Sequence, residues 1–308
     1  MAHPNIALVK YWGKQTAPGN LPATPSVSVT LSALETTTRV ETAAADRLLI
    51  NDVEAVDPKI AQFLDLLRRT YPIPPLHIDT HNNFPTGAGL ASSASGFAAL
   101  TTAINAHSGL QLDTATLSGW ARCGSASAAR SMFAGFVSLQ APHWQAHTIA
   151  DDQFWPLDIV VAITDESVKS VSSSVGMENS RLTSPFYPAW VETCADDHAC
   201  ALTAIRARDF EQLSAIAEHS CLKMHAMMLA TQPALAYWKP ATVAAMQSVR
   251  ALRAEGVPVF FTIDAGPQLK AICLPGHADT VEAALSTVNG VTRTLRCGLG
   301  TGARVVST

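Results

Sequence analysis

Hydrophobic and polar residues alternate in several short stretches of this chain, a pattern typical of half-buried strands. The alternation is clear in residues 25–31, Pro-Ser-Val-Ser-Val-Thr-Leu. Residues 36–56 predict two more strands, with Asn51 and Asp52 as a turn within the second. Further strands are expected at residues 76–82, 136–140, 157–164, 259–264 and 302–306.

Other stretches carry apolar residues three and four positions apart, which predicts amphipathic helices. Residues 60–71 are one example, with Ile60, Phe63, Leu64 and Leu67 on one face. Helices are expected likewise at residues 90–108, 113–123, 199–229 with a break at Asp209, 240–255 and 281–288. By contrast, residues 165–177 are rich in serine and valine and predict a mobile loop.

The stretch from Asn83 to Leu100 runs from turn residues directly into a helical pattern of small residues. A glycine-rich loop that enters a helix leaves backbone N–H groups available to an anion. Ser92 and Ser93 add hydroxyls that suit phosphate oxygens or a metal ion. The spacing matches neither the Walker pattern nor the dinucleotide pattern. Two interpretations stay open, a phosphate-binding loop and a small-residue helix packed against a sheet.

Three other places carry polar residues in patterns that suit a binding site. Lys10 and Lys14 bracket Tyr-Trp-Gly, and they are either site residues or solvated strand ends. Residues 124–131, Gly-Ser-Ala-Ser-Ala-Ala-Arg-Ser, place two serines before an arginine at a helix start, which suits one phosphate group. Asp264 ends an apolar strand before a Gly-Pro turn, where a carboxylate serves either a cleft or its own turn.

Composition narrows the class of protein. The 308 residues carry a formal net charge of −4, which argues against a nucleic-acid binder. We expect no membrane partner either, because no apolar run approaches the ~20 residues of a membrane span. The opening residues also lack the apolar core of a signal peptide. The six cysteines form no CxxC pair, and Cys194, His198 and Cys200 lack a fourth ligand for zinc. We therefore expect a cytoplasmic protein with reduced thiols.

Four blocks together resemble one family. Residues 5–14, 82–99, 124–131 and 262–267 are similar, in order and spacing, to signature blocks of the mevalonate diphosphate decarboxylases. These enzymes form a branch of the GHMP kinase superfamily, and the Lys-Tyr-Trp-Gly-Lys and Asp-Ala-Gly-Pro blocks are specific to that branch. The resemblance extends from residue 5 to at least residue 267.

The resemblance implies an α+β fold of two lobes, the two-lobed GHMP kinase fold. A lobe similar to ribosomal protein S5 domain 2, at residues 1–178, would bind ATP. A ferredoxin-like lobe at residues 179–308 would close over the cleft. The implied reaction uses ATP and Mg2+ to convert mevalonate 5-diphosphate into isopentenyl diphosphate, CO2, ADP and phosphate. Family members are commonly cytoplasmic homodimers, so we expect the same here.

The resemblance also implies roles for individual residues. Asp264 matches the catalytic aspartate, and Lys10 matches the lysine that holds it ionised. Substrate binding is implied for Tyr11, Lys14, Ser125, Ser127, Arg130 and Arg181. Nucleotide binding is implied for Asn82, Gly87, Gly89, Ser92 and Ser93, with Ser93 also beside the metal ion.

The chain departs from the family pattern in the substrate serine loop. Ala126 stands where glycine is usual and Ala129 where cysteine is usual. Ala126 places a methyl group beside the substrate serines, whereas Ala129 changes only packing. The chain is also shorter than eukaryotic members, which suggests a bacterial type. Two alternatives stay open: an enzyme of the same fold that acts on the 5-monophosphate or only phosphorylates the 3-hydroxyl, and a binding protein without catalysis.

Overall fold

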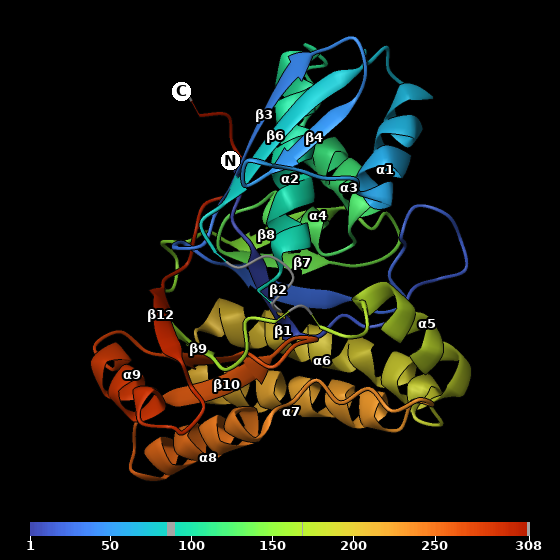
Figure 1. The fold of residues 1–308 in the computed structure, drawn as a ribbon. Coiled ribbons are helices and arrows are strands. Elements are labelled where there is room, and N and C mark those ends of the chain that lie inside the picture. Colours follow the sequence, from blue (N-terminus) through green and yellow to red (C-terminus); the bar gives the residue numbers. More distant parts are fainter. Residues whose placement is uncertain (85–89, 168, 307–308) are drawn as a thin grey trace.

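The computed structural model describes residues 1–84, 90–167 and 169–306. Within these ranges, three four-stranded sheets and their helices form an α+β fold of two lobes (Figure 1). The predicted fold class is therefore confirmed.

The first lobe carries a mixed sheet in the order β3-β6-β4-β5. Its strands are β3 (Thr36–Thr42), β6 (Leu76–Asn82), β4 (Arg47–Ile50) and β5 (Val53–Glu54). Helices α1 (Pro58–Arg68), α2 (Ser92–His107) and α3 (Thr114–Gly124) bury their apolar stripes in one cluster with this sheet. In that cluster Phe63 meets Phe97 edge-on, with ring centroids 5.4 Å apart. Most residues of α2 from Ala94 to Ile104 are buried, whereas Ser92 and Ser93 at its start are not.

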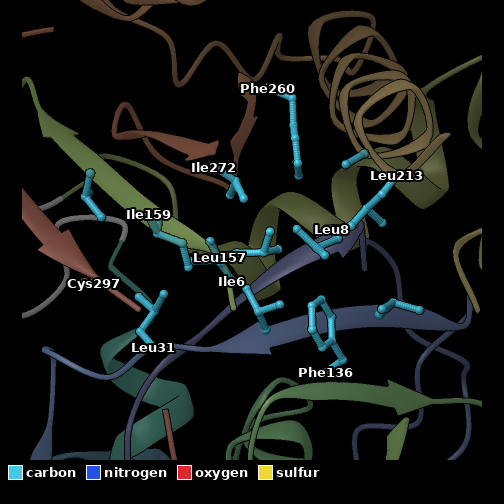
Figure 2. Packing of buried hydrophobic residues seen from close by; sticks show 14 of the residues in the cluster. Ile6, Leu8, Leu31, Phe136, Leu157, Ile159, Leu213, Phe260, Ile272 and Cys297 are labelled. Carbon is cyan, nitrogen blue, oxygen red and sulfur yellow. The ribbon is translucent and has the colours of Figure 1, made fainter. Parts of the chain in front are cut away.

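Two antiparallel sheets lie at the centre of the molecule. The first has the order β1-β2-β7-β8, made of β1 (Asn5–Val9), β2 (Ser26–Thr30), β7 (Phe136–Leu139) and β8 (Ala146–Ala150). The second has the order β10-β11-β9-β12, made of β10 (Val259–Ile263), β11 (Leu269–Cys273), β9 (Asp158–Ile163) and β12 (Arg293–Cys297). Figure 2 shows side chains of both sheets in one core, including Ile6, Phe136, Ile159 and Phe260. The lobes are therefore joined by a shared apolar core.

The helices of the second lobe are α5 (Ser173–Thr183), α6 (Tyr187–Ala207), α7 (Phe210–Leu229), α8 (Pro240–Ala254) and α9 (Ala278–Ser286). Helices α6 and α7 pack into the shared core, whereas α8 and α9 pack in a separate cluster against the β10-β11-β9-β12 sheet. The expected break at Asp209 is confirmed. This residue is the N-cap of α7, and its side chain accepts a hydrogen bond from the Gln212 N–H. One further short helix, α4 (Ala128–Ser131), follows the serine loop in the first lobe.

Several element predictions were wrong. The first five residues of α5, 173–177, lie in the stretch predicted as a loop, and Ser172 caps the helix by accepting a hydrogen bond from the Val175 N–H. Helix α6 begins at Tyr187, ahead of the predicted start at residue 199. The strands β8, β11 and β12 were not predicted, and residues 302–306 form no strand. Residues 302–306 follow a segment that is hydrogen-bonded to the first lobe, because the Gly300 N–H donates to the Thr30 carbonyl.

The sheets do not divide at the expected domain boundary. The ranges 1–178 and 179–308 stay a prediction, but β9 lies before residue 178 and pairs with β11 and β12 of the second lobe. The C-terminal segment also returns to the first lobe, where Met1 and Arg304 exchange backbone hydrogen bonds. The six cysteines are free thiols. No helix in the described ranges has the length and apolarity to cross a bilayer.

Candidate active site

Two strands of different sheets end beside each other and bring a lysine to an aspartate. Lys10 follows β1 and Asp264 follows β10, and Lys10 Nζ donates to Asp264 Oδ1 over 2.6 Å. The lysine side chain is 1% exposed and the aspartate side chain 24% exposed. The pair therefore lies at the bottom of a cleft with the carboxylate on its surface. Of the two interpretations of Asp264, the cleft is the one that the structure supports.

Opposing effects set the protonation of Asp264. Burial raises the pKa of this carboxyl, but the nearby charges of Lys10, Lys270 and Arg130 lower it further than burial raises it. The net result is a pKa well below the usual range, so Asp264 is a carboxylate throughout the neutral range. Lys270 reaches it from β11, with Nζ 3.5 Å from Oδ2.

Arg130 is held rigidly at the side of the same cleft. The residue lies in α4 and is only 2% exposed. Its Nε donates to Asn5 Oδ1 over 3.2 Å and its Nη1 to Ser26 Oγ over 2.7 Å. Burial lowers the pKa of the guanidinium to about 10, and the charges of Asp264 and Tyr11 act in the opposite direction. A buried guanidinium that forms no salt bridge with any described carboxylate is well suited to a bound anion.

Hydroxyl groups of serine and tyrosine side chains line the wall of the cleft. Ser93 Oγ lies 3.3 Å from Ser125 Oγ, which lies 3.2 Å from Ser127 Oγ. The Tyr11 hydroxyl is buried and has no hydrogen-bond partner among the described residues. Ala91 is the N-cap residue of α2. Its backbone is in the left-handed conformation, and it has no polar side chain to cap the helix. These groups suit phosphate oxygens, which accept hydrogen bonds from hydroxyls and from helix N-termini.

Two more lysines reach the cleft from loops. Lys14 Nζ donates to Asn20 Oδ1 over 2.8 Å and to Ser174 Oγ over 3.2 Å. Lys169 Nζ donates to Ser173 Oγ over 2.8 Å and to the Ala265 carbonyl over 3.2 Å. Burial lowers the pKa of both ammonium groups. Lys169 also joins the loop before α5 to the residue after Asp264.

These groups enclose a cavity of about 290 Å³. Of the described residues that line it, the cationic ones are Lys10, Lys14, Lys59, Arg130 and Lys169, and the acidic one is Asp264. A second cavity of about 440 Å³ adjoins it and shares Lys14, Asn20 and Lys59. The cleft is therefore strongly cationic although the chain as a whole carries a net charge of −4.

Most of the residues predicted for the site line this cavity, namely Lys10, Tyr11, Lys14, Ser92, Ser93, Ser125, Ser127, Arg130 and Asp264. Gly87 and Gly89 lie outside the described residues. Asn82 ends β6 and accepts a hydrogen bond from Thr36 Oγ1 over 2.6 Å, and it does not line the cavity.

Arg181 does not line the cavity either. It lies on α5, where its Nη2 pairs with Glu178 Oε1 at 2.6 Å. Ala126, the departure from the family pattern, does line the cavity and is 4% exposed. Its methyl group therefore packs inward beside Ser125 and Ser127.

Several lining residues were not predicted, among them Asn5, Asn20, Lys59, Lys169, Ser173 and Ser174. Lys270 was missed as well. The serine-rich stretch around Ser172 beside Lys169 carried a usable signal, because the same residue types mark the other two loops. Lys270 gave no signal, because a lone lysine in a strand is ordinarily a solvated residue.

Family models match most of the chain. A diphosphomevalonate decarboxylase-like N-terminal domain matches residues 2–150, and a mevalonate 5-diphosphate decarboxylase C-terminal domain matches residues 159–297. This chain belongs to the diphosphomevalonate decarboxylase family. The resemblance predicted from four sequence blocks is thereby confirmed.

Individual relatives agree with this assignment over nearly the whole chain. The diphosphomevalonate decarboxylase of Candida albicans is 32% identical, covering 98% of this chain and 96% of the relative. The crystal structure of mevalonate diphosphate decarboxylase from Staphylococcus aureus is 33% identical, with a TM-score of 0.93, covering 99% of this chain and 96% of that chain. A structure described as MDDEF in complex with MVAPP, AMPPCP and magnesium is 34% identical, with a TM-score of 0.92, covering 100% of this chain and 98% of that chain.

Proposed function

We propose that the cleft converts mevalonate 5-diphosphate and ATP into isopentenyl diphosphate, CO2, ADP and phosphate. One observation carries the proposal: an ionised aspartate, paired with a buried lysine, lies in a cavity whose other charged lining residues are cationic. The substrate is a polyanion with a neutral tertiary alcohol. A cationic wall would bind its charged ends, and one carboxylate would meet the alcohol.

The diphosphate would bind on the side of Arg130. The bonds of this guanidinium to Asn5 and Ser26 use Nε and Nη1, so Nη2 would meet the diphosphate, and Lys14 supplies a second positive charge. The Tyr11 hydroxyl, buried without a partner in the described chain, would donate to a phosphate oxygen. Burial of unpaired donors is costly in the absence of an anion, so these groups are arranged for a ligand.

The residues present fit ATP and Mg2+. Bound ATP supplies the phosphoryl group that turns the 3-hydroxyl into a leaving group. Ser92 and Ser93, at the start of α2, would hold its phosphates together with Lys169. Within the described ranges there is no cluster of three His, Cys, Asp or Glu side chains that could hold a metal ion. A magnesium ion would therefore be held mainly by phosphate oxygens, with the Ser93 hydroxyl beside it.

The chemistry proceeds in two stages. In the first, Asp264 would accept a hydrogen bond from the 3-hydroxyl and take its proton as the new oxygen–phosphorus bond forms, while the bond from the γ-phosphorus to the bridging oxygen breaks and ADP leaves. In the second, the C3–O bond breaks and phosphate leaves with the electron pair, taking back the proton from Asp264 and so restoring its carboxylate. Positive charge develops at C3, where the Asp264 carboxylate stabilises it. The C1–C2 bond then gives its electron pair to the C2–C3 double bond, and CO2 leaves.

Lys10 would hold the aspartate in place during both stages. Its 2.6 Å hydrogen bond restricts Oδ1, and its buried charge favours the carboxylate over the acid. Because the lysine is 1% exposed, water does not screen this interaction.

A coupled ADP-release assay with trapped CO2 tests the proposal. The purified chain is given ATP and Mg2+ with mevalonate, its 5-phosphate or its 5-diphosphate. We expect ADP and CO2 in equal amounts with the 5-diphosphate and little turnover with the other two. ADP without CO2 would indicate a 3-kinase, preference for the 5-phosphate would indicate the monophosphate enzyme, and no turnover with any of them would contradict the proposal.

A cytoplasmic homodimer belongs to the same proposal. Six free thiols support a reducing compartment. Leu182 and Phe186, which are 62% and 54% exposed at the end of α5 and just after it, support a surface for self-association. Sedimentation of the parent and of Leu182→Glu tests the dimer, and a monomeric parent would contradict it.

A further inference from the structure

Lys270 lies behind Asp264, on the side opposite to Lys10. It belongs to β11 and is paired in register with Thr262 of β10, two residues before Asp264. Its side chain is 1% exposed, so the ammonium group has no contact with bulk water. Lys270 Nζ lies 3.5 Å from Asp264 Oδ2. A lysine this deeply buried requires anionic or hydrogen-bonding partners, and this carboxylate is an ionic one.

The two oxygens of the carboxylate have different surroundings. Oδ1 accepts the 2.6 Å hydrogen bond from Lys10. Oδ2 is shielded from solvent and accepts no hydrogen bond from the described part of the chain. The 24% exposure of the Asp264 side chain therefore comes from its other atoms. Oδ2 faces the interior and Lys270, which leaves Oδ1 as the oxygen that a ligand in the cavity would meet.

We propose that Lys270 is a positioning residue, which holds Oδ2 in the interior and thereby directs Oδ1 toward the 3-hydroxyl of the substrate. This inference rests on the proposed function for the identity of that hydroxyl. The pairing of Lys270 with Asp264 does not depend on it. Lys270 then acts through Asp264 and does not touch the substrate.

Other groups around Asp264 cannot replace this one. Lys10 already donates a hydrogen bond to Oδ1, and Arg130 donates its hydrogen bonds to Asn5 and Ser26. The titratable or charged groups that act on Asp264, or on which it acts, are Lys10, Cys221, His225, Arg130, Lys169 and Lys270. Burial lowers the pKa of His225 to about 3, so its ring is neutral. Burial raises the pKa of the Cys221 thiol, which is neutral too.

Lys270→Met keeps the length of the side chain and removes its charge. Oδ2 would then be a buried anionic oxygen without a cation. The carboxylate would turn away from the substrate, and it would also take up a proton more readily, since loss of a nearby cation raises its pKa. Both changes slow the chemistry but leave the phosphate-binding groups intact. We therefore expect kcat to fall ~30-fold at neutral pH with KM for the 5-diphosphate within about threefold of the parent.

The pH profile separates this role from a merely structural one. Because protonation of Asp264 is easier in Lys270→Met, its kcat should decrease further as pH falls from 8 to 5.5, relative to the parent. Lys223→Met is the matched control, because it removes a lysine that pairs with Asp197 outside the cavity at 2.6 Å. The control should keep the parent's profile. A kcat for Lys270→Met within threefold of the parent, or a loss that is equal at every pH, overturns the proposal.

A double-mutant cycle on thermal unfolding tests the pairing without substrate. Melting temperatures are measured for the parent, Lys270→Met, Asp264→Asn and the double variant. Each single change leaves the other charge with one partner fewer, so the combined shift should differ from the sum of the single shifts by about 3 °C or more. The cycle with Lys223→Met in place of Lys270→Met should be additive. If Lys270→Met does not fold, Lys270→Gln takes its place in both experiments.

Failure of the proposed function and failure of the proposed role of Lys270 give different results. A parent that does not turn over the 5-diphosphate contradicts the proposed function, and the unfolding cycle still measures the pairing. An active parent with an additive Lys270–Asp264 cycle overturns the role of Lys270 alone.

Discussion

The Asp264 carboxylate lies between two buried lysines, and this arrangement determines what its replacement should do. Asp264→Asn keeps the size and one oxygen but removes the charge. Proton acceptance and stabilisation of charge at C3 would be lost together, so we expect kcat to fall at least ~10³-fold, about 4 kcal/mol of barrier. Affinity for ATP and the 5-diphosphate should stay near normal, because Lys14 and Arg130 are intact. Steady-state rates and equilibrium binding measure both, and turnover within tenfold of the parent would contradict the role.

Arg130 should not tolerate replacement by lysine. Its guanidinium is positioned by Asn5 and Ser26, and an ammonium group cannot make these bonds and also bind a phosphate in the same geometry. We expect Arg130→Lys to lower kcat/KM for the 5-diphosphate by ~10-fold or more, about 1.4 kcal/mol. Arg253→Lys, which alters an ion pair with Glu218, is the matched control and should have normal kinetics. Unchanged kinetics for Arg130→Lys would remove it from the site.

Ser93 and Ser95 separate a ligand-binding role from a structural one within a single helix. Ser93 lines the cavity, whereas Ser95 is buried and its hydroxyl lies 2.7 Å from that of Thr36. We expect Ser93→Ala to weaken ATP binding or lower kcat with little change in affinity for the 5-diphosphate. Ser95→Ala should instead lower the melting temperature while the dependence on ATP stays normal. Nucleotide titrations and thermal unfolding compare the two, and a purely thermal effect of Ser93→Ala would make position 93 structural.

Sequence alone predicted the residues that lie in motifs and missed those that support them. Lys10, Arg130 and Asp264 stand at strand ends or a helix start, where motif and local pattern both indicate a site. Asn5 and Lys270 lie within strands. Asn5 bonds to Arg130, which is 125 residues away, and Lys270 reaches Asp264 only because β11 pairs with β10. No local pattern carries that information.

At the scale of elements, helix α6 is joined to β7 by a buried histidine. His198 is 4% exposed and its Nε2 lies 2.8 Å from Ser138 Oγ. Burial, helped by the charge of His147, lowers the pKa of His198 to about 4. The ring is thus neutral in the folded state and takes up a proton near pH 6.5 when unfolded. Stability from this residue is present above pH 6.5 and is lost as pH falls toward 4.

His198→Gln should therefore flatten the acid side of the stability curve. Glutamine can still bond to Ser138 but takes up no proton in the unfolded state. Between pH 7 and 4 we expect the variant to lose about 3 kcal/mol less unfolding free energy than the parent. Urea unfolding at a series of pH values measures this, and His225 remains in both proteins as an internal reference. Parallel curves for parent and variant would contradict the assignment.

Elements whose apolar residues recur at a regular helical or strand spacing were predicted from the sequence, and elements without such a spacing were not. Helix α1 carries a clear apolar stripe, and its predicted and observed positions agree within three residues. Helix α5 has no such stripe, since it exposes Val175 and Leu182, so its serines indicated a loop. Strand β12 has charged residues at both Arg293 and Arg296, and in the described part of the chain it is an edge strand beside β9. Its position is set by the sheet and not by its own sequence.

At the scale of the whole molecule, charge is separated between the cleft and the rest of the surface. The chain has a net charge of −4, yet the charged lining residues of the described cavity are five cations and one carboxylate. Composition alone suggested a mildly acidic protein and gave no sign of a cationic cleft, because the lysines and the arginine come from four separate segments. Only the two-lobed fold brings them together.

This separation predicts that substrate capture depends on salt. Positive potential in a concave site attracts polyanions, and added ions screen it because the Debye length is about 10 Å at 0.1 M. We expect KM for the 5-diphosphate to rise ~10-fold between about 0.02 and 0.3 M KCl while kcat changes little. Lys59 is exposed at the rim, so Lys59→Met should reduce this slope without altering kcat at saturation. Lys223→Met, which lies outside the cavity, should keep the parent's slope. Initial rates across the salt series decide the matter, and a KM independent of salt would mean that short-range contacts alone capture the substrate.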